Sequence, residues 1–301
     1  MKLQKVIKSA RSFADPFCIT DGDRFRLKDV DPNDTLNLTS QDKARAKEAL
    51  AIGVEALAKL QEMLYAQDRW AVLLIFQALD AAGKDGAIKH VMSGINPQGC
   101  QVFSFKSPSP EELDHDYLWR TVKALPERGR IGIFNRSYYE EVLVVRVHPE
   151  ILGGQRLPDH LVTRDIWKER FEDIAAFERY LSRNGTQILK FFLHVSKDAQ
   201  RSRLLARLDE KSKNWKFELG DLDERERWDD YMDAYEQALS RTSTKHAPWF
   251  VVPADHKWFT RLVIAELVVK ALEGLDLSYP KVSKTQVAAL VEARKRLERE
   301  R

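Results

Sequence analysis

A lysine flanked by glycines and acids stands in FQALDAAGKDGAIKHV, residues 76–91. The segment reads A-x-x-x-x-G-K-D where a phosphate-binding loop has G-x-x-x-x-G-K-[ST]. Lys84 keeps the position whose ammonium group neutralises phosphate oxygens, and Gly83 lets the backbone approach an anion. Ala78 and Asp85 replace the first glycine and the metal-binding hydroxyl. The pattern fits an ordinary strand-to-helix turn with a solvent lysine, but its place directly after an apolar run favours phosphate chemistry.

Two carboxylates accompany this lysine. Asp80 lies four residues before Lys84, and an acid beside a phosphate site is repulsive unless a cation lies between them. We therefore expect Asp80 to bind Mg²⁺ or to orient the acceptor. Asp85 fits either a metal contact or a first-turn acid favoured by the helix dipole. The residues expected to hold phosphate in this loop are Ala82, Gly83, Lys84, Asp85 and Gly86.

Two further segments carry residues suited to phosphate. IFNRSYYEEVLVVRV places Asn135 and Arg136 at the end of an apolar run, and the arginine fork matches phosphate oxygens. An ion pair between Arg136 and Glu140, four residues on, is the simpler alternative. Residues 197–221, KDAQRSRLLARLDEKSKNWKFELGD, are rich in basic side chains. Those expected to meet phosphate are Arg203, Arg207, Lys211, Lys213 and Lys216.

Five apolar segments alternate with helical patterns and must position these side chains. The predicted strands are 70–78, 102–106, 130–135, 187–196 and 249–255. The predicted helices begin at Ser40 and Ser109 and cover 84–94, 138–147, 159–183, 197–209 and a segment ending near Leu272. Such alternation predicts an α/β fold with a five-stranded parallel sheet, whose ligands bind at the carboxyl ends of the strands. A basic helix is usually a solvated face, but after the fourth strand it suggests a mobile lid. On the next helix, Trp228, Tyr231 and Tyr235 are expected to be core packing.

The predicted organisation has three parts. Residues 1–40 form an irregular N-terminal arm, 41–280 form the main domain with a helical lid at about 197–240, and 281–301 form a charged helical tail. The net charge of +3 on 301 residues argues against a polycation that coats nucleic acid. Cys18 and Cys100 have no metal-ligand spacing and are expected to be reduced thiols of a cytoplasmic protein. We expect neither a signal peptide nor a membrane span.

Several long motifs together resemble one family. They are LDAAGKDGAIKHV, INPQGCQVFSFKSPSPEELDHDYLWR, FNRSYYEEVLVVRVHPE, NWKFELGDLDERERWDDY and APWFVVPADHKWF. In this order, from about residue 25 to 280, they resemble the polyphosphate kinase 2 enzymes. The resemblance implies a P-loop kinase-like three-layer sandwich with a helical lid. It also implies phosphoryl transfer between inorganic polyphosphate and nucleotides, with Mg²⁺ or in its place Mn²⁺, and a homo-oligomer, dimeric or tetrameric.

The resemblance also implies roles for single residues. Asp80, Lys84, Arg136 and Arg207 match the catalytic set, with Arg203 as the alternative lid arginine. Many members have Asp where this chain has Asn135, whose amide offers a metal an oxygen but no charge. Glu140 and Arg136 are expected to bind the nucleotide.

The acceptor and the donor leave alternatives open. Glu140, where relatives using only diphosphates tend to carry Asn, favours the class III subgroup, which accepts nucleoside mono- and diphosphates. Alternatives are an enzyme restricted to diphosphates, an ATP-dependent kinase of a small substrate, and a binding regulator without turnover.

Overall fold

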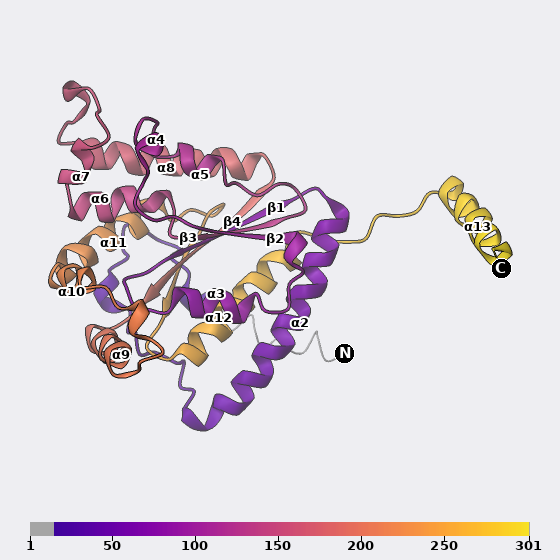
Figure 1. The fold of residues 1–301 in the computed structure, drawn as a ribbon, viewed down its shortest axis with the longest axis horizontal. Coiled ribbons are helices and arrows are strands. Elements are labelled where there is room, and N and C mark those ends of the chain that lie inside the picture. The colour runs from indigo at the N-terminus through magenta and orange to yellow at the C-terminus, as the bar shows by residue number, and fades with distance from the viewer. Residues whose placement is uncertain (1–14, 301) are drawn as a thin grey trace.

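Five apolar segments form one parallel sheet in the computed structural model, which describes residues 15–300 (Figure 1). The strands are β1 Ala71–Gln77, β2 Cys100–Ser104, β3 Ile131–Asn135, β4 Thr186–His194 and β5 Trp249–Pro253. Their order is β2-β3-β1-β4-β5, and each neighbouring pair is parallel. β1 lies at the centre and is buried along its whole length, which is why AVLLIFQ reads as a continuous apolar run.

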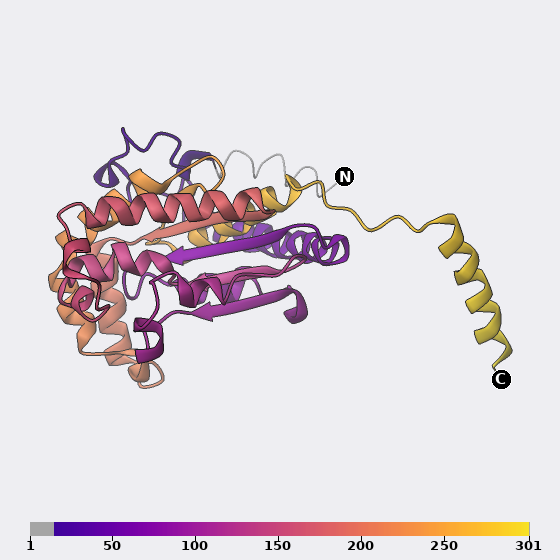
Figure 2. The same ribbon diagram turned by 90° about the horizontal axis from the view of Figure 1, so that it is seen from above.

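Helices cover both faces of this sheet (Figures 1 and 2). The longer helices are α2 Lys43–Gln67, α3 Lys84–Val91, α8 Ile166–Arg183, α9 Lys197–Asp209, α10 Gly220–Glu226, α11 Trp228–Thr242, α12 Lys257–Glu273 and α13 Lys284–Arg299. The short ones are α4 Pro110–Leu113, α5 Trp119–Val122, α6 Val144–Val147 and α7 Glu150–Gly153. The 3₁₀ turns are η1 Asp15–Phe17, η2 Leu27–Asp29, η3 Ser40–Asp42, η4 Pro97–Gly99, η5 Tyr138–Val142, η6 Asp159–Leu161 and η7 Asn214–Lys216. One face carries α2, α3 and α12, and the other carries α5, α6 and α8. The result is a three-layer arrangement.

The strand register brings two loops together. In the pairing of β1 with β3, Phe76 lies opposite Asn135, and the Arg136 amide donates to the Phe76 carbonyl oxygen at 3.0 Å. The loop after β1 and the turn after β3 therefore leave the same edge of the sheet side by side. The strand arrows point to the end of the molecule where α9 and α10 lie (Figure 2). This edge is where a doubly wound sheet binds its ligands.

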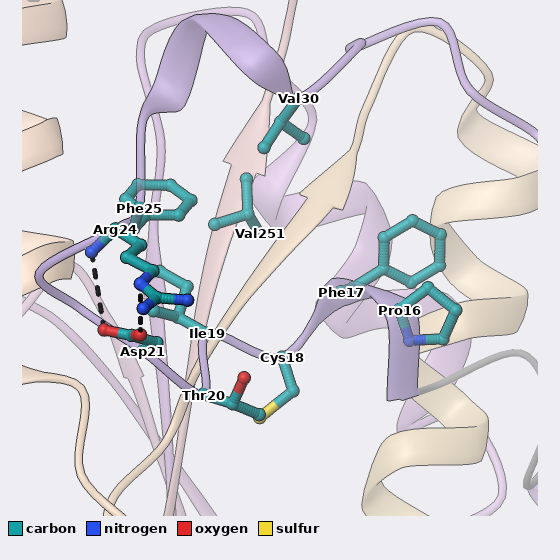
Figure 3. A pocket seen from close by; sticks show the side chains of 10 residues that line it. All are labelled: Pro16, Phe17, Cys18, Ile19, Thr20, Asp21, Arg24, Phe25, Val30 and Val251. Carbon is teal, nitrogen blue, oxygen red and sulfur yellow. Dashed lines mark hydrogen bonds and ion pairs between the residues drawn. The ribbon is translucent and has the colours of Figure 1, made fainter.

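The N-terminal segment from residue 15 follows the outer strand β5. The Ile19 amide donates to the Trp249 carbonyl oxygen at 3.0 Å, and Cys18 forms an isolated antiparallel bridge with Phe250. An open strand edge is a template for unwanted pairing, and this segment covers part of it. A pocket of about 250 Å³ lies between the segment and Val251, and is lined mainly by apolar side chains (Figure 3).

Several predicted elements differ from those observed. β2 begins at Cys100 rather than near 102, because this edge strand is half-exposed and its apolar signal is weak. The helix predicted from Ser109 to about 125 is two short helices, α4 and α5. The Ser109–Glu112 capping box is present, but the Asp116 carboxylate accepts from the Leu118 amide and forms a competing turn. Residues 138–147 divide into η5 and α6, and α8 begins only at Ile166.

The last helix stands apart from the sheet. An extended segment leads away from α12 to α13, whose residues are all exposed (Figures 1 and 2). Residues 1–14 of the predicted N-terminal arm lie outside the described residues. Within residues 15–300, no helix is both long and apolar enough to cross a membrane.

Candidate active site

The loop after β1 has the backbone of an anion-binding turn. Ala81 has a φ of 59° and Gly83 a φ of 108°, both in the left-handed region. Gly83 can adopt this conformation without strain, and it directly precedes α3. The first turn of α3 contains Lys84, Asp85 and Gly86, which line the cleft described below, and a helix leaves its first N–H groups without intrahelical partners. The sequence pattern therefore corresponds to a loop that ends in a helix N-terminus.

Lys84 is held inside this loop. Its Nζ donates to the Ala78 carbonyl oxygen at 2.7 Å, and its side chain is buried. Burial lowers the pKa of the ammonium, and the nearby Arg136 lowers it further, while Asp80 and Glu140 oppose the shift. An incoming phosphate would supply negative charge that opposes this shift and favours the charged ammonium.

Arg136 joins the turn after β3 to the phosphate loop. Its guanidinium lies 3.0 Å from an Asp80 carboxylate oxygen and 3.7 Å from one of Glu140. The predicted i+4 ion pair with Glu140 is therefore present, and Asp80 is a second partner that the sequence did not predict. Next to it, the Asn135 amide nitrogen donates to the Asp85 carboxylate at 2.7 Å. We call residues 78–86 and 135–140 together the loop edge.

Arg203 of α9 lines the cleft and supports the phosphate loop. Its guanidinium donates to four carbonyl oxygens, at distances of 2.6 to 3.1 Å. These belong to Ala81, Ala82, Ala254 and Asp255. The arginine thus ties the loop after β1 to the loop after β5.

Arg207, one helical turn further along α9, is bound differently. It donates to the Asp221 carboxylate of α10 at 2.9 Å and to the Lys216 carbonyl oxygen at 3.1 Å. Burial raises the pKa of Asp221, and the carboxylate of Asp80 raises it further. The sequence did not predict Asp221 as the partner of Arg207, because no pattern in ELGD distinguishes it from the neighbouring Glu218. Arg207 therefore joins α9 to α10 at the cleft.

The three predicted lysines are placed unequally. Lys213 and Lys216 line the cleft, whereas Lys211 is exposed and is not among the lining residues. Lys213 pairs with Glu210, and the Lys216 ammonium lies 4.9 Å from the centre of the Trp215 ring.

All these elements surround one cleft of about 920 Å³. Three lysine and arginine side chains that line the cleft were missed by the sequence reading. One is Lys106, and the others are Lys257 and Arg261, which share a face at the start of α12. Burial lowers the pKa of Lys257, and four neighbouring cations lower it further. They are Arg203, Arg261, Lys213 and Arg207. The signal in the sequence was a basic i, i+4 pair on the helix directly after the fifth strand.

The far wall of the cleft is aromatic and acidic. Tyr231 and Tyr235 of α11 are buried, as predicted for core residues, and they also line the cleft. The Tyr231 hydroxyl and His148 Nε2 both lie within hydrogen-bond distance of the Glu224 carboxylate, at 2.5 and 3.0 Å. His148 and Glu224 are additional cleft residues that the sequence reading missed.

The comparison with known proteins agrees with this geometry. The sequence model of the family described as Polyphosphate kinase 2 (PPK2) matches residues 39–279. The chain belongs to the polyphosphate kinase 2 family. The predicted resemblance is therefore confirmed, and the loop with Ala78 and Asp85 is that of a polyphosphate kinase 2 protein. Helix α13 lies beyond the matched residues.

Several members of the polyphosphate kinase 2 family are close to this chain. A protein from Rhodopseudomonas palustris named ADP-polyphosphate phosphotransferase is 56% identical over 258 residues, which cover 85% of this chain and 89% of that protein. A protein from Meiothermus ruber named AMP/ADP-polyphosphate phosphotransferase is 48% identical, covering 85% of this chain and 92% of its own. The crystal structure of polyphosphate kinase 2 from Arthrobacter aurescens has a TM-score of 0.83 at 43% identity, covering 93% of this chain and 96% of that one. The predicted α/β fold is confirmed.

The donor set of this polyphosphate kinase 2 protein suits a metal that substrate phosphates help to bind. Within residues 15–300, no group of three or more His, Cys, Asp or Glu side chains could hold a metal ion. Mg²⁺ commonly takes only one or two protein carboxylates and completes its shell with phosphate and water. Asp80 and the Asn135 amide at the loop edge fit that smaller contribution.

Proposed function

We propose that the protein transfers the terminal phosphoryl group of inorganic polyphosphate to nucleoside mono- and diphosphates, converting AMP to ADP and ADP to ATP. The cleft supports this proposal because it gathers cations from separate elements around one space. Lys84 and Arg136 come from the loop edge, Arg207 from α9, and Lys257 and Arg261 from α12. Two polyanions must meet in this reaction, and their repulsion is the main obstacle that such cations remove.

The transfer needs no strong general base. An oxygen of the acceptor's terminal phosphate, already ionised near neutral pH, forms a bond to the end phosphorus of polyphosphate. The bond from that phosphorus to its bridging oxygen breaks, and the shortened polyphosphate keeps the electron pair. Lys84 and Arg136 would hold the transferring group, and Arg207 would approach it from the lid. We assign the lid role to α9 and α10, which we call the lid helices.

Asp80 and Arg136 would change partners when substrates bind. In this structure the Arg136 guanidinium forms an ion pair with the Asp80 carboxylate at 3.0 Å. A phosphate oxygen would take the guanidinium, and Asp80, with the Asn135 amide, would hold Mg²⁺, or Mn²⁺ in its place. When bound, the cation would neutralise phosphate charge between the carboxylate and the substrates.

Two pairs of basic side chains line opposite sides of the cleft near the loop edge, and we propose that polyphosphate binds between them. Lys213 and Lys216 lie on the side of the lid helices, while Lys257 and Arg261 lie on the side of α12. Burial lowers the pKa of Lys257, and the four cations around it lower it further. An anionic chain would relieve the repulsion among these cations. Polyphosphate would therefore lie between the lid helices and α12.

A second candidate is an enzyme restricted to diphosphate acceptors. The relative at 56% identity is named for ADP alone, whereas the relative at 48% is named for AMP and ADP. Glu140 is the feature that favours the wider acceptor range. Its carboxylate accepts from the Gln77 side-chain amide at 2.8 Å and lies in the cleft beside Arg136.

A phosphotransfer assay tests the proposal and its rivals. Pure protein with long-chain polyphosphate and Mg²⁺ receives AMP or ADP, and chromatography follows ADP and ATP. Both products from AMP support the dual-acceptor function, and ATP from ADP alone supports the diphosphate-specific one. Product formation only with ATP as donor, or none at all, would contradict both. Omitting Mg²⁺ and adding a chelator tests the metal, and the expected result is loss of turnover that added Mg²⁺ restores.

We also propose a cellular location and an oligomeric state for the protein. We infer a cytoplasmic location from its nucleotide substrates and from two cysteines that form no disulfide. We infer a dimer or tetramer from the family resemblance, and light scattering of the purified protein would measure it.

A further inference from the structure

A buried ion pair lies behind the cleft, outside the set of residues that line it. Lys190 stands in the middle of β4, within the apolar run QILKFFLH, and its side chain has no exposed surface. Its Nζ lies 2.5 Å from the carboxylate of Glu178 on α8, which is also fully buried. A lysine and a glutamate inside a core require an explanation, because moving either charge from water is costly.

Every polar atom of the pair has a partner. Lys190 also donates to the Tyr139 hydroxyl at 2.9 Å and to the Thr242 carbonyl oxygen at 2.8 Å, which uses all three of its protons. The second oxygen of Glu178 accepts from the hydroxyls of Tyr138 and Tyr139, at 2.9 and 2.8 Å. The Thr242 hydroxyl oxygen lies 2.9 Å from the Tyr139 hydroxyl oxygen and accepts from the Trp249 indole at 2.9 Å. We call these six residues the buried network.

The buried network ends at two elements that border the cleft. Tyr138 and Tyr139 are the first residues of η5, and Glu140 is the next. Arg136 comes two residues before Tyr138, with a φ of 64° that is unfavourable for a non-glycine residue. Thr242 is the last residue of α11, whose earlier turns place Tyr231 and Tyr235 in the cleft. The network therefore fixes the base of the turn that presents Glu140 and Arg136.

Stability alone does not account for this arrangement. Replacing a buried ion pair by apolar side chains of similar volume is often neutral or stabilising, so the fold does not require charges here. A network in which every polar atom is hydrogen-bonded fixes the positions of its side chains, because hydrogen bonds are directional. An apolar core at this place would hold η5 by packing, but would leave its position along the sheet less defined.

We propose that Lys190 and Glu178 are positioning residues for the nucleotide side of the cleft, acting through Tyr139 on the turn that carries Glu140. This inference rests on the proposed function, in which Glu140 and Arg136 meet the acceptor. The basic side chains between which polyphosphate is proposed to bind lie outside the buried network, so binding of the polyphosphate chain does not depend on it. They are Lys213, Lys216, Lys257 and Arg261.

The test removes both charges together. The double variant K190M/E178Q keeps nearly the same volume, and we expect its melting temperature to remain within a few degrees of the parent. Its KM for ADP should rise about ten-fold, while its KM for polyphosphate should stay within about two-fold. The single variant K190M leaves the Glu178 charge without its partner, so its melting temperature should fall by on the order of 10 °C.

Two further variants separate positioning from general damage. Tyr139→Phe removes one link and keeps both charges, and it should raise the KM for ADP in the same direction with a smaller effect. Glu266→Gln alters another buried carboxylate, on α12, that has no bond to η5, and it should change neither KM. If the double variant does not fold, Tyr139→Phe decides the question by the same two constants.

The outcomes distinguish this inference from the proposed function. Normal KM values for both substrates in a folded double variant would overturn it, and so would an equal rise in both. If the parent protein shows no polyphosphate-dependent turnover, the proposed function fails by itself. Calorimetry of ADP and of polyphosphate binding then replaces the kinetic constants, and a loss of ADP affinity alone would still support positioning.

Discussion

The loop edge and the lid helices both supply cations to one cleft, but they are built in opposite ways. At the loop edge, Lys84 is buried and bonded to a carbonyl oxygen, and Arg136 is held between two carboxylates. Of the lid helices, α10 has no buried residue and α9 has two, Gln200 and Leu204. In the segment between them, Trp215 and Leu219 are 77% and 78% exposed. The first region is fixed by the sheet, while the second has little core of its own.

This difference suggests a division of labour. Segments with few buried apolar contacts open at low free energy, and moving lids are drawn from them. Groups that must hold the transferring phosphoryl group need a rigid base, and the loop edge has one in β1 and β3. Arg203 lies where the regions meet, since it belongs to α9 but donates to the carbonyl oxygens of the fixed loops. We expect α9 to serve as the hinge side of the lid.

Removing the loop-edge lysine should have the largest effect. Lys84→Ala takes away a fixed charge at the phosphate site, and turnover should fall by about a thousand-fold or more. Circular dichroism should remain that of the parent, because the loop is also held by Arg203. Lys59→Ala on α2, which removes a surface lysine paired with Glu55, is the matched control and should stay fully active. Substantial turnover in Lys84→Ala would remove the lysine from the mechanism.

The lid arginine should matter next. Arg207→Ala should lower kcat by about a hundred-fold and leave the KM for either substrate nearly unchanged, because its charge is needed when the lid closes on the transferring group. Arg207→Lys keeps the charge without the planar fork and should recover only part of the rate. A rise in KM without a fall in kcat would show that Arg207 only binds substrate.

The sequence predicted the loop edge better than the lid. Lys84, Asp80 and Arg136 follow apolar strands, and the order of parallel strands forces such loops to one edge, so their proximity could be inferred from pattern alone. The arginines of α9 share a face, but Arg203 donates to the loops after β1 and β5, whereas Arg207 donates to Asp221 and Lys216. The local sequence does not indicate this difference. Asp221 and the buried Lys190 pair with side chains on other elements, and no local pattern indicates such contacts. For Lys257 the sequence offered only the basic i, i+4 pair with Arg261.

The basic pair on α12 should affect one substrate only. Lys257→Ala combined with Arg261→Ala should raise the KM for long-chain polyphosphate about ten-fold and leave that for ADP unchanged. The effect should shrink as salt concentration rises, since the lost interaction is electrostatic and screened. Initial rates at two ionic strengths measure this. An equal effect on ADP would place the nucleotide, and not polyphosphate, between the lid helices and α12.

A smaller and selective change is expected at Glu140. Glu140→Asn removes the charge and shortens the side chain by one methylene, which weakens the hydrogen bond with Gln77. Turnover with AMP should fall about ten-fold more than turnover with ADP, because Glu140 is proposed to extend the acceptor range to monophosphates. Gln77→Ala, which removes the partner, should move the same ratio in the same direction. An unchanged ratio of AMP to ADP turnover would show that acceptor choice is set elsewhere.

Glu266 should change stability without changing turnover, because it lies on α12 and is not among the residues lining the cleft. It is 9% exposed, one carboxylate oxygen has no hydrogen-bond partner among the described residues, and burial raises its pKa from 4.5 to about 7. The folded protein therefore keeps this proton up to about pH 7, whereas the unfolded chain releases it near pH 4.5. The folded state binds more protons in that window, so this stabilisation is full below pH 4.5 and is lost as pH rises through 7.

The lost stabilisation is at most about 3 kcal/mol. Glu266→Gln removes the charge, so it should remove this pH dependence and raise stability at pH 8, as measured by urea unfolding from pH 5 to 8. If the variant and the parent lose stability in parallel across that range, the proton is not on Glu266. If the variant also loses activity, Glu266 contributes to turnover as well as to stability, and the expectation that it affects stability alone is wrong.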